Sequence, residues 1–205
     1  MPPVMAEGID SEVQSWVREG QLDPAATRIF EVYGSEIYGF LLSLMHNETA
    51  AGDVFSQLGE DLWNGLPKFK FGCSIRTWLY VLARHAAARY RRSPWNKGER
   101  RGAESRIDSL VEIARSRTQP WQRTEIKDRF SQLRESLDPD DQILLTLRID
   151  RDLAWNDVAK VMLDGEAADA AALQRETDRL RKRFQLLKTD LRKRAEAAGL
   201  LDVAQ

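Results

Sequence analysis

The sequence predicts an all-α protein of two small helical domains joined by a flexible linker, and three observations support this. Apolar residues recur at the three-to-four-residue spacing of amphipathic helices, and no segment shows the alternation of a half-buried strand. A stretch rich in proline, glycine and charge, residues 93–118, separates two groups of such segments. The length of 205 residues suits one domain or two small ones.

The composition limits the class of protein. A single cysteine, Cys73, excludes an internal disulfide, and with only two histidines a structural zinc site is not expected. No apolar run approaches the roughly 20 residues of a membrane span, and the N-terminus lacks the basic start and apolar run of a signal peptide. We therefore expect a cytoplasmic protein with no metal, no other cofactor and no membrane contact.

The first domain is expected at residues 8–92, and its four predicted helices cover residues 11–19, 27–45, 49–66 and 74–92. Asp10 or Ser11 is the expected N-cap of the first helix, and Pro67 ends the third. Trp63, near the end of the third helix, is expected in the core. The second helix is expected to bury Ile29, Phe30, Tyr33, Ile37, Phe40, Leu41 and Leu44. The fourth is expected to bury a band formed by Ile75, Leu79, Leu82, Ala83, Ala86 and Tyr90.

The second domain is expected at residues 119–198, and its four predicted helices cover residues 120–137, the segment after Asp138-Pro139, residues 153–163 and residues 169–198. The expected inward positions of the first three are Ile126, Phe130, Leu133, Leu137, Ile143, Leu144, Leu147, Ile149, Trp155, Val158, Ala159 and Met162. On the last helix one apolar stripe contains Leu173, Thr177, Leu180, Phe184, Leu187 and Leu191. Four cations lie opposite this stripe: Arg175, Arg179, Lys182 and Lys193.

Charge is distributed unevenly, although the formal net charge is only −1. Residues 1–62 contain eleven acidic and two basic residues, a net charge of −9. Residues 84–106 contain eight basic and two acidic residues, and residues 175–194 contain nine basic and three acidic residues, so each segment has a net charge of +6. An acidic front and two basic segments indicate one protein partner and two contacts to a polyanion.

One edge of the core band on helix 74–92 carries an aromatic residue, a histidine and two arginines: Trp78, His85, Arg89 and Arg92. A helix that only buries itself has no need of such an edge, whereas a helix that stacks on bases and pairs with phosphates does. Nucleic acid is therefore the expected ligand. Two alternatives stay open: Trp78 as a packing residue only, and His85 as a partly exposed residue without a base contact.

Four segments resemble bacterial RNA polymerase sigma factors of the extracytoplasmic-function (ECF) group. The family's region 2.1 is similar to RIFEVYGSEIYGFLLSL, and its region 2.2 to GDVFSQLGEDLW. The family pattern S-F-R-A-W-L-Y-x-I-A-R-N-x-x-x-D-x-x-R-R matches SIRTWLYVLARHAAARYRR almost position for position. Region 4, which begins a helix-turn-helix, resembles SLDPDDQILLTLRIDRDLAWNDVAKVM. Both halves occur in the family's order with a linker between them.

The resemblance implies a transcription initiation factor, not an enzyme, which binds core RNA polymerase and directs it to promoter DNA. The first domain, as region 2, would dock on polymerase and melt the −10 element, while the loop from Phe69 to Ser74 surrounds an extruded base. The residues implied in −10 binding are Lys68, Lys70, Arg76, Trp78, Arg84, His85, Arg89 and Arg92. Those implied in −35 binding by the second domain, region 4, are Arg175, Arg179, Arg181, Lys182 and Arg183. Those implied in polymerase binding are Asp53, Gln57, Glu60 and Asp61. An anti-sigma factor is a further partner that the resemblance allows.

Region 2.2 departs from the family because its acidic character is diluted. Of the family's DAED stretch only Asp53 remains, so docking by opposite charges is expected to be weaker. Phosphorylation of Thr49 or Ser56 by a Ser/Thr kinase is a candidate replacement, because it adds about −1.5 to −2 charge at one residue. The alternative is that Asp53, Glu60 and Asp61 suffice.

The helix-turn-helix also departs from the family, because it is stretched by about eleven residues between Met162 and Leu180, very nearly three helical turns. One explanation is that the last helix has grown at its N-terminus, which keeps its apolar face in phase. The other is that residues 164–172 form a loop or a separate turn and the reading helix begins near Arg175. The sequence leaves both open.

Two other classes of function also stay open. A stand-alone helix-turn-helix regulator that does not engage polymerase would explain the weak region 2.2. A helical interaction protein whose basic faces bind an acidic protein would show negligible DNA affinity even at low salt. An enzyme is not expected, because the sequence has no Gly-rich phosphate loop, no paired carboxylates in a plausible cleft and no nucleophile with a base.

Overall fold

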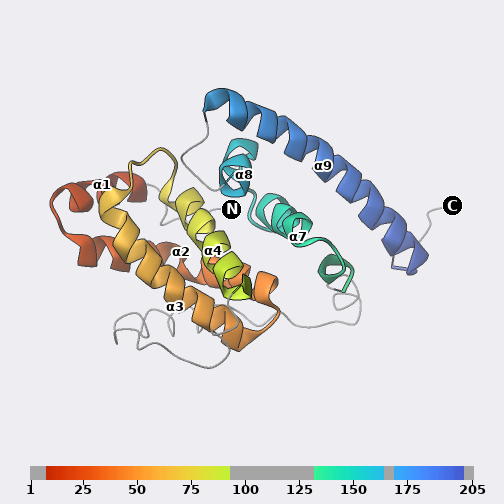
Figure 1. The fold of residues 1–205 in the computed structure, drawn as a ribbon, viewed down its shortest axis with the longest axis horizontal. Coiled ribbons are helices and arrows are strands. Elements are labelled where there is room, and N and C mark those ends of the chain that lie inside the picture. Colours follow the sequence, from red (N-terminus) through yellow and green to blue (C-terminus); the bar gives the residue numbers. More distant parts are fainter. Residues whose placement is uncertain (1–7, 93–131, 164–168, 201–205) are drawn as a thin grey trace. The chain divides into compact units, whose positions relative to one another are not determined.

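The computed structural model describes residues 8–92, 132–163 and 169–200, and every regular element in these ranges is a helix (Figure 1). The predicted all-α fold class is confirmed. The elements are α1 (Ile9–Arg18), α2 (Leu22–Met45), α3 (Glu48–Gly65), η2 (Leu66–Lys68), α4 (Ile75–Arg92), α7 (Pro139–Leu145), η4 (Thr146–Asp150), α8 (Trp155–Met162) and α9 (Ala170–Ala197). The predicted linker 93–118 and most of the helix predicted at 120–137 lie outside the described residues.

The chain divides into two compact units. The first contains α1 to α4, the second contains α7, η4 and α9, and the division runs through α8 just before Lys160. Within the described ranges no helix is long and apolar enough to cross a membrane. The same residues include no group of three or more His, Cys, Asp or Glu side chains that could hold a metal ion.

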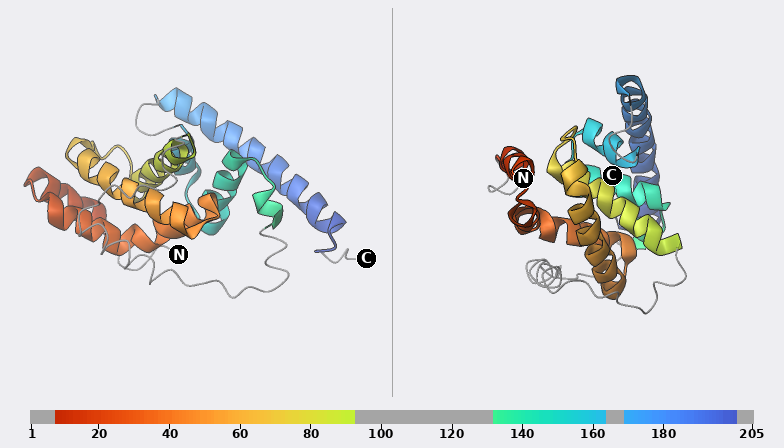
Figure 2. Two further views of the ribbon diagram at one scale, coloured as in Figure 1. Left: turned by 60° about the horizontal axis from the view of Figure 1, so that its bottom comes forward. Right: turned by 60° about the vertical axis from the view of Figure 1, so that its left-hand side comes forward.

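In the first unit α2 is the central helix: α1, α3 and α4 pack against it, and α3 and α4 also pack against each other (Figures 1 and 2). The rings of Phe30 and Tyr38 on α2 meet Phe55 of α3 edge-on, each with a centroid separation of 5.5 Å. Phe40 of α2 meets Tyr80 of α4 in the same way at 5.0 Å. All seven apolar residues predicted to be buried on this helix are buried: Ile29, Phe30, Tyr33, Ile37, Phe40, Leu41 and Leu44.

Short local signals set the ends of these helices. Asn47 caps α3, since its Oδ1 accepts a hydrogen bond from the Ala50 N–H at 2.8 Å. Pro67 lies in η2 and ends α3 as predicted. The N-cap position of α1 is Gly8, with no side-chain cap hydrogen bond, so the prediction that Asp10 or Ser11 caps this helix is wrong.

The second helix begins earlier than predicted, at Leu22 rather than Thr27. Asp23-Pro24 indicates a turn in the sequence, but proline is tolerated in the first turn of a helix, where its missing N–H has no intrahelical acceptor. On α4 the predicted band is confirmed in part: Leu82 and Tyr90 are only half-buried. The buried surface of α4 is broader than a stripe and also includes Thr77, Trp78, Tyr80, Val81 and Ala87.

In the second unit α9 packs against α7, and several side-chain contacts connect it to the preceding helices. Arg183 binds Asp141 of α7 at 2.5 Å, and Phe184 meets Trp155 of α8 edge-on at 5.4 Å. The residues buried as predicted are Leu137, Ile143, Leu144, Leu147, Val158 and Ala159, while Leu133, Trp155 and Met162 are half-buried. Ile149 is 51% exposed, because the wider π-type turn of η4 takes it off the apolar stripe.

The structure decides between the two alternatives for the last helix. Asp169 caps α9 through its Oδ1, which accepts the Ala172 N–H at 2.6 Å, and the helix then runs from Ala170 to Ala197. The helix extended at its N-terminus is therefore correct, and a start near Arg175 is wrong. The predicted stripe is buried at Thr177, Leu180, Phe184 and Leu187 and half-buried at Leu173 and Leu191.

Candidate nucleic-acid interface

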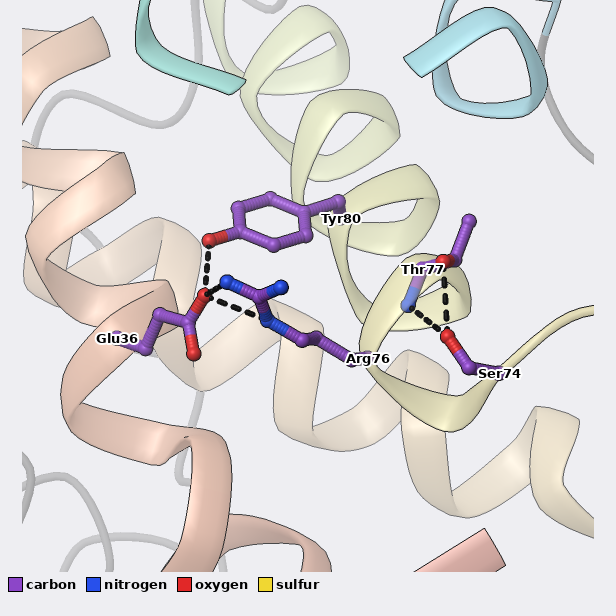
Figure 3. Close-up of polar contacts among 5 residues, drawn as sticks. All are labelled: Glu36, Ser74, Arg76, Thr77 and Tyr80. Atoms are coloured by element: carbon purple, nitrogen blue, oxygen red, sulfur yellow. Dashed lines mark hydrogen bonds and ion pairs between the residues drawn. The ribbon is translucent and has the colours of Figure 1, made fainter. Parts of the chain in front are cut away.

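The first turn of α4 is fixed by hydrogen bonds on two sides (Figure 3). Ser74 caps it: its Oγ accepts the Thr77 N–H at 3.1 Å and lies 2.8 Å from Thr77 Oγ1. On the other side, Glu36 of α2 accepts three hydrogen bonds at its Oε1, from Arg76 Nε at 2.9 Å, from Arg76 Nη2 at 2.5 Å and from the Tyr80 hydroxyl at 2.6 Å. The start of α4 is therefore held rigidly against α2.

Arg76 is thus placed in an ion pair within the fold, although the sequence predicts it as a contact to −10 DNA. Only 22% of its side chain and 13% of the Glu36 side chain are exposed. Although burial opposes the charge, the hydrogen bond that Arg76 donates to Glu36 and the negative charge of Glu36 raise the pKa of the Arg76 guanidinium. Nearby, burial and then the charge of Asp10 raise the pKa of Tyr33 from 10.0 to about 12. Glu36, Arg76 and Tyr80 thus form a largely buried polar cluster between α2 and α4.

Trp78 lies in an aromatic stack instead of on an open edge of α4. Its side chain is only 9% exposed, and Phe69 stacks on it with a centroid separation of 4.3 Å and an interplanar angle of 11°. Gly65 at the end of α3 approaches it so closely that an added Cβ atom would lie 3.0 Å from the Trp78 ring. The ring therefore anchors the loop 69–74 to α3 and α4, which corresponds to the packing alternative for this residue.

Phe71 is the third ring of this stack, 4.7 Å from Phe69 between centroids. It is half-buried, whereas Phe69 and Trp78 are buried, so it is the most accessible of the three rings. Its φ of 56° lies in the left-handed region, which costs energy for a bulky side chain. The sequence pointed to this loop, but it did not distinguish Phe71 from the other rings, since the backbone conformation has no local sequence signal.

The remaining predicted −10 residues occupy varied surroundings. Lys68 and Lys70 are exposed on either side of Phe69. Arg84 and His85 are half-buried on α4. Arg89 forms an ion pair with Asp61 of α3, and the exposed Arg92 donates from its Nε to the Ala88 carbonyl at 3.2 Å. The structure thus places a predicted DNA residue, Arg89, directly against a predicted polymerase residue, Asp61.

The solvent-facing side of α3 contains the residues predicted to bind polymerase. Gln57 donates from its amide to Glu60 at 3.1 Å. Burial, followed by the charge of Asp53 and a hydrogen bond to it, raises the pKa of Tyr90 on α4. Of the two candidate phosphorylation sites, Thr49 is exposed in the first turn of α3, and Ser56 is half-buried with its Oγ donating to the Gly52 carbonyl at 3.1 Å.

Trp63 belongs to this same side of α3, and its predicted burial is wrong, since 40% of the residue is exposed. Residues three or four apart share a helix face, so Trp63 continues the row formed by Thr49, Asp53, Ser56 and Glu60. The spacing from Glu60 was the signal for this position. It was missed because a large apolar residue on a helix is usually assigned to the core.

On α9 the predicted −35 residues separate into two groups. Arg175, Arg179 and Lys182 are exposed opposite the buried stripe, and Arg179 pairs with Glu176 one turn before it at 3.1 Å. Arg181 lies 6.0 Å from the centroid of the Trp155 ring and 3.6 Å from Asp178. Arg183 is bound to Asp141, and this hydrogen bond raises the pKa of its guanidinium although burial opposes the shift. Of these five residues only Arg183 is half-buried, while Arg181 is exposed like the first group.

Comparisons with known proteins agree with this geometry. Residues 29–96 match the family model of sigma-70 region 2, a range that includes α3, η2, α4 and most of α2. An RNA polymerase sigma-H factor of Pseudomonas aeruginosa is 29% identical over 136 residues, which are 63% of this chain and 70% of that relative. Residues 29–96 are therefore similar to sigma-70 region 2, and both findings support a sigma factor.

Proposed function

We propose that this protein is a sigma factor of the ECF type, which binds core RNA polymerase and directs it to promoters in the cytoplasm. The observation that supports this most strongly is the sigma-70 region 2 match over the helices that frame the aromatic loop 69–74. In the proposal the first unit docks on polymerase and opens the −10 element. The second unit then binds the −35 element through α9.

Within the first unit the proposal assigns base capture to Phe71. Stacking of an unpaired base on an aromatic ring contributes ~1–3 kcal/mol, and such a ring must have an accessible face. Phe71 is the most accessible ring of its stack, and its left-handed backbone is the kind of strain found at binding sites. Lys68 and Lys70 supply positive charge for the phosphates on either side of the base. Trp78 supports the loop and does not touch the base.

Polymerase docking is assigned to the solvent-facing side of α3. Few acidic residues remain there, and Trp63 adds a large aromatic surface of the kind that dominates binding energy at interfaces. Thr49 is the better of the two candidate phosphorylation sites, because it is exposed and a phosphate in the first turn of α3 would be favoured by the helix dipole. The hydroxyl of Ser56 already donates to the helix backbone.

One observation favours the second candidate function, a DNA-binding regulator that does not engage polymerase. Two acids predicted to dock on polymerase already have partners within the first unit, Asp53 with Tyr90 and Asp61 with Arg89. If these contacts persist, Arg89 offsets the charge of Asp61 and Tyr90 occupies Asp53, so docking by opposite charges is weaker. Such a regulator would bind promoter DNA alone and would not co-purify with core polymerase.

Transcription in vitro tests the proposal. Purified protein and core polymerase are incubated with sheared genomic DNA from the source organism, and the RNA start sites are sequenced. The wild-type protein is expected to produce discrete starts, the Phe71→Ala variant is expected to lose them, and both are expected to bind polymerase equally. Thr49→Asp is expected to raise transcription relative to Thr49→Ala. Failure of the wild-type protein, and also of Thr49→Asp, to bind polymerase or start any RNA contradicts the proposal.

A further inference from the structure

Asp10 of α1 makes a contact that no local pattern predicts. Its Oδ1 accepts a hydrogen bond from the Ile75 N–H at 2.9 Å, between residues 65 apart in the sequence. The first N–H groups of a helix have no acceptor within the helix itself. Ser74 takes the Thr77 N–H, and Asp10 takes that of Ile75. The first turn of α4 is therefore capped by two side chains, one of them from a separate helix.

This contact lies at one end of the loop proposed to capture a base. The loop begins at Phe69, which is anchored by its stacking on Trp78. It ends at Ser74, immediately before the amide that Asp10 holds. Between these two anchors Phe71 has a strained backbone, and Lys70 and Gly72 are exposed. The position of Phe71 therefore depends on both anchors.

The negative charge of Asp10 has two opposing consequences for DNA binding. A carboxylate beside a loop that binds phosphates opposes DNA binding through like-charge repulsion. The same carboxylate also stabilises the start of α4, because it accepts a backbone N–H at a helix N-terminus, where negative charge is favoured. Removing the charge should consequently strengthen DNA binding, whereas removing the hydrogen-bond acceptor should weaken promoter opening.

We infer that Asp10 is a positioning residue for promoter opening: through the Ile75 amide it fixes the start of α4 and with it the loop that presents Phe71. The inference extends the site to α1, which precedes the residues 29–96 that match sigma-70 region 2. It rests on the proposed function, because promoter opening is the activity that the loop would perform.

The test compares Asp10→Asn, which keeps an oxygen acceptor, with Asp10→Ala, which removes it. The matched control is Glu12→Ala, which removes another acid from the first turn of α1, one that binds Arg28 at 3.3 Å. Each full-length variant is combined with core polymerase and a promoter recovered in the transcription experiment, labelled with 2-aminopurine in the −10 element. Fluorescence reports opening, and retention of polymerase by the tagged protein reports docking.

Asp10→Ala is expected to reduce opening about three- to tenfold, the range of one net hydrogen bond, while docking stays unchanged. Asp10→Asn and Glu12→Ala are expected to open the promoter within about twofold of the wild type. Both Asp10 variants are expected to bind a scrambled duplex slightly more tightly at low salt, since a negative charge is gone. Only Asp10→Ala would thus combine weaker promoter opening with tighter binding to the scrambled duplex. A general loss of stability would lower both and cannot produce this combination.

Amide hydrogen exchange of the free protein adds a readout that needs no promoter. The Ile75 amide is expected to exchange faster in Asp10→Ala than in Asp10→Asn or the wild type. Equal opening by Asp10→Ala and the wild type overturns the inference, as does equal loss in both Asp10 variants. If the wild-type protein opens no promoter, both the proposed function and the inference are wrong. If the wild-type protein opens the promoter and Asp10→Ala opens it equally well, only the inference is wrong.

Discussion

The two units of the chain use their arginines in different ways. In the first unit, two arginines predicted to contact DNA bind carboxylates of neighbouring helices, Arg76 with Glu36 and Arg89 with Asp61. In the second unit, Arg175 and Lys182 project from α9 opposite its buried stripe. The difference corresponds to the two tasks proposed. Opening DNA requires a rigid frame around one loop, whereas contacting a groove requires one straight helix with side chains that reach out.

The largest loss of stability is expected when the aromatic stack of the first unit is disrupted. Trp78→Ala removes a buried indole and is expected to lower the free energy of unfolding by about 3–5 kcal/mol. Phe71→Ala is the matched control: its ring is half-buried, so less than about 2 kcal/mol is expected. Urea unfolding followed by circular dichroism measures both. An equal decrease in the free energy of unfolding for both variants would mean that Trp78 does not anchor the loop 69–74.

The ion pairs of the first unit are expected to differ in strength. Glu36→Ala leaves the Arg76 guanidinium and the Tyr80 hydroxyl without their shared acceptor in a largely buried position, so we expect a loss of about 2–4 kcal/mol. Asp61→Ala breaks a pair in which Arg89 is 48% exposed, and we expect at most about 1 kcal/mol. The same urea experiment compares them. A similar loss in both variants would show that Arg76 is no more structural than Arg89.

Alkaline pH is expected to weaken the first unit specifically. Burial, together with Asp10 and Glu36 and against the opposing charge of Arg76, raises the pKa of Tyr33 from 10.0 to about 12. Between these two pH values the folded protein keeps the phenol proton and the unfolded chain loses it, so stability is complete below pH 10 and falls as the pH rises toward 12.

Tyr33→Phe is expected to remove this part of the pH dependence of the free energy of unfolding, up to about 3 kcal/mol. All four tyrosines lie in the first unit, so tyrosinate absorbance reports on that unit alone. Asp10→Asn is expected to lower the midpoint of the Tyr33 titration. An unchanged pH dependence in Tyr33→Phe would mean that another group is responsible.

Periodicity predicted most of the fold, because helices that bury one face must repeat apolar residues at helical spacing. The buried stripe of α9 and the core of α2 were found in this way. The contact of Asp10 with Ile75 was not found, because it joins residues distant in sequence through a backbone amide that every residue has. The ion pair of Arg76 with Glu36 was not found for a related reason: the sequence shows the charge of a cation on a helix, but not the carboxylate that α2 places beside it.

Adjacent cations on α9 have different surroundings, so their substitutions are expected to differ by a small amount in stability and in DNA affinity. Lys182 is exposed, so Lys182→Ala is expected to leave stability within about 0.5 kcal/mol and to reduce the slope of log affinity against log salt for promoter DNA by about 1. Arg183 is bound to Asp141 at 2.5 Å, so Arg183→Ala is expected to lower the free energy of unfolding by about 1–2 kcal/mol and leave the slope unchanged. Fluorescence anisotropy at several salt concentrations gives the slope. If Arg183→Ala reduced the slope as much as Lys182→Ala, the ion pair with Asp141 would have to open on DNA, and Arg183 would be a DNA contact instead of part of the fold.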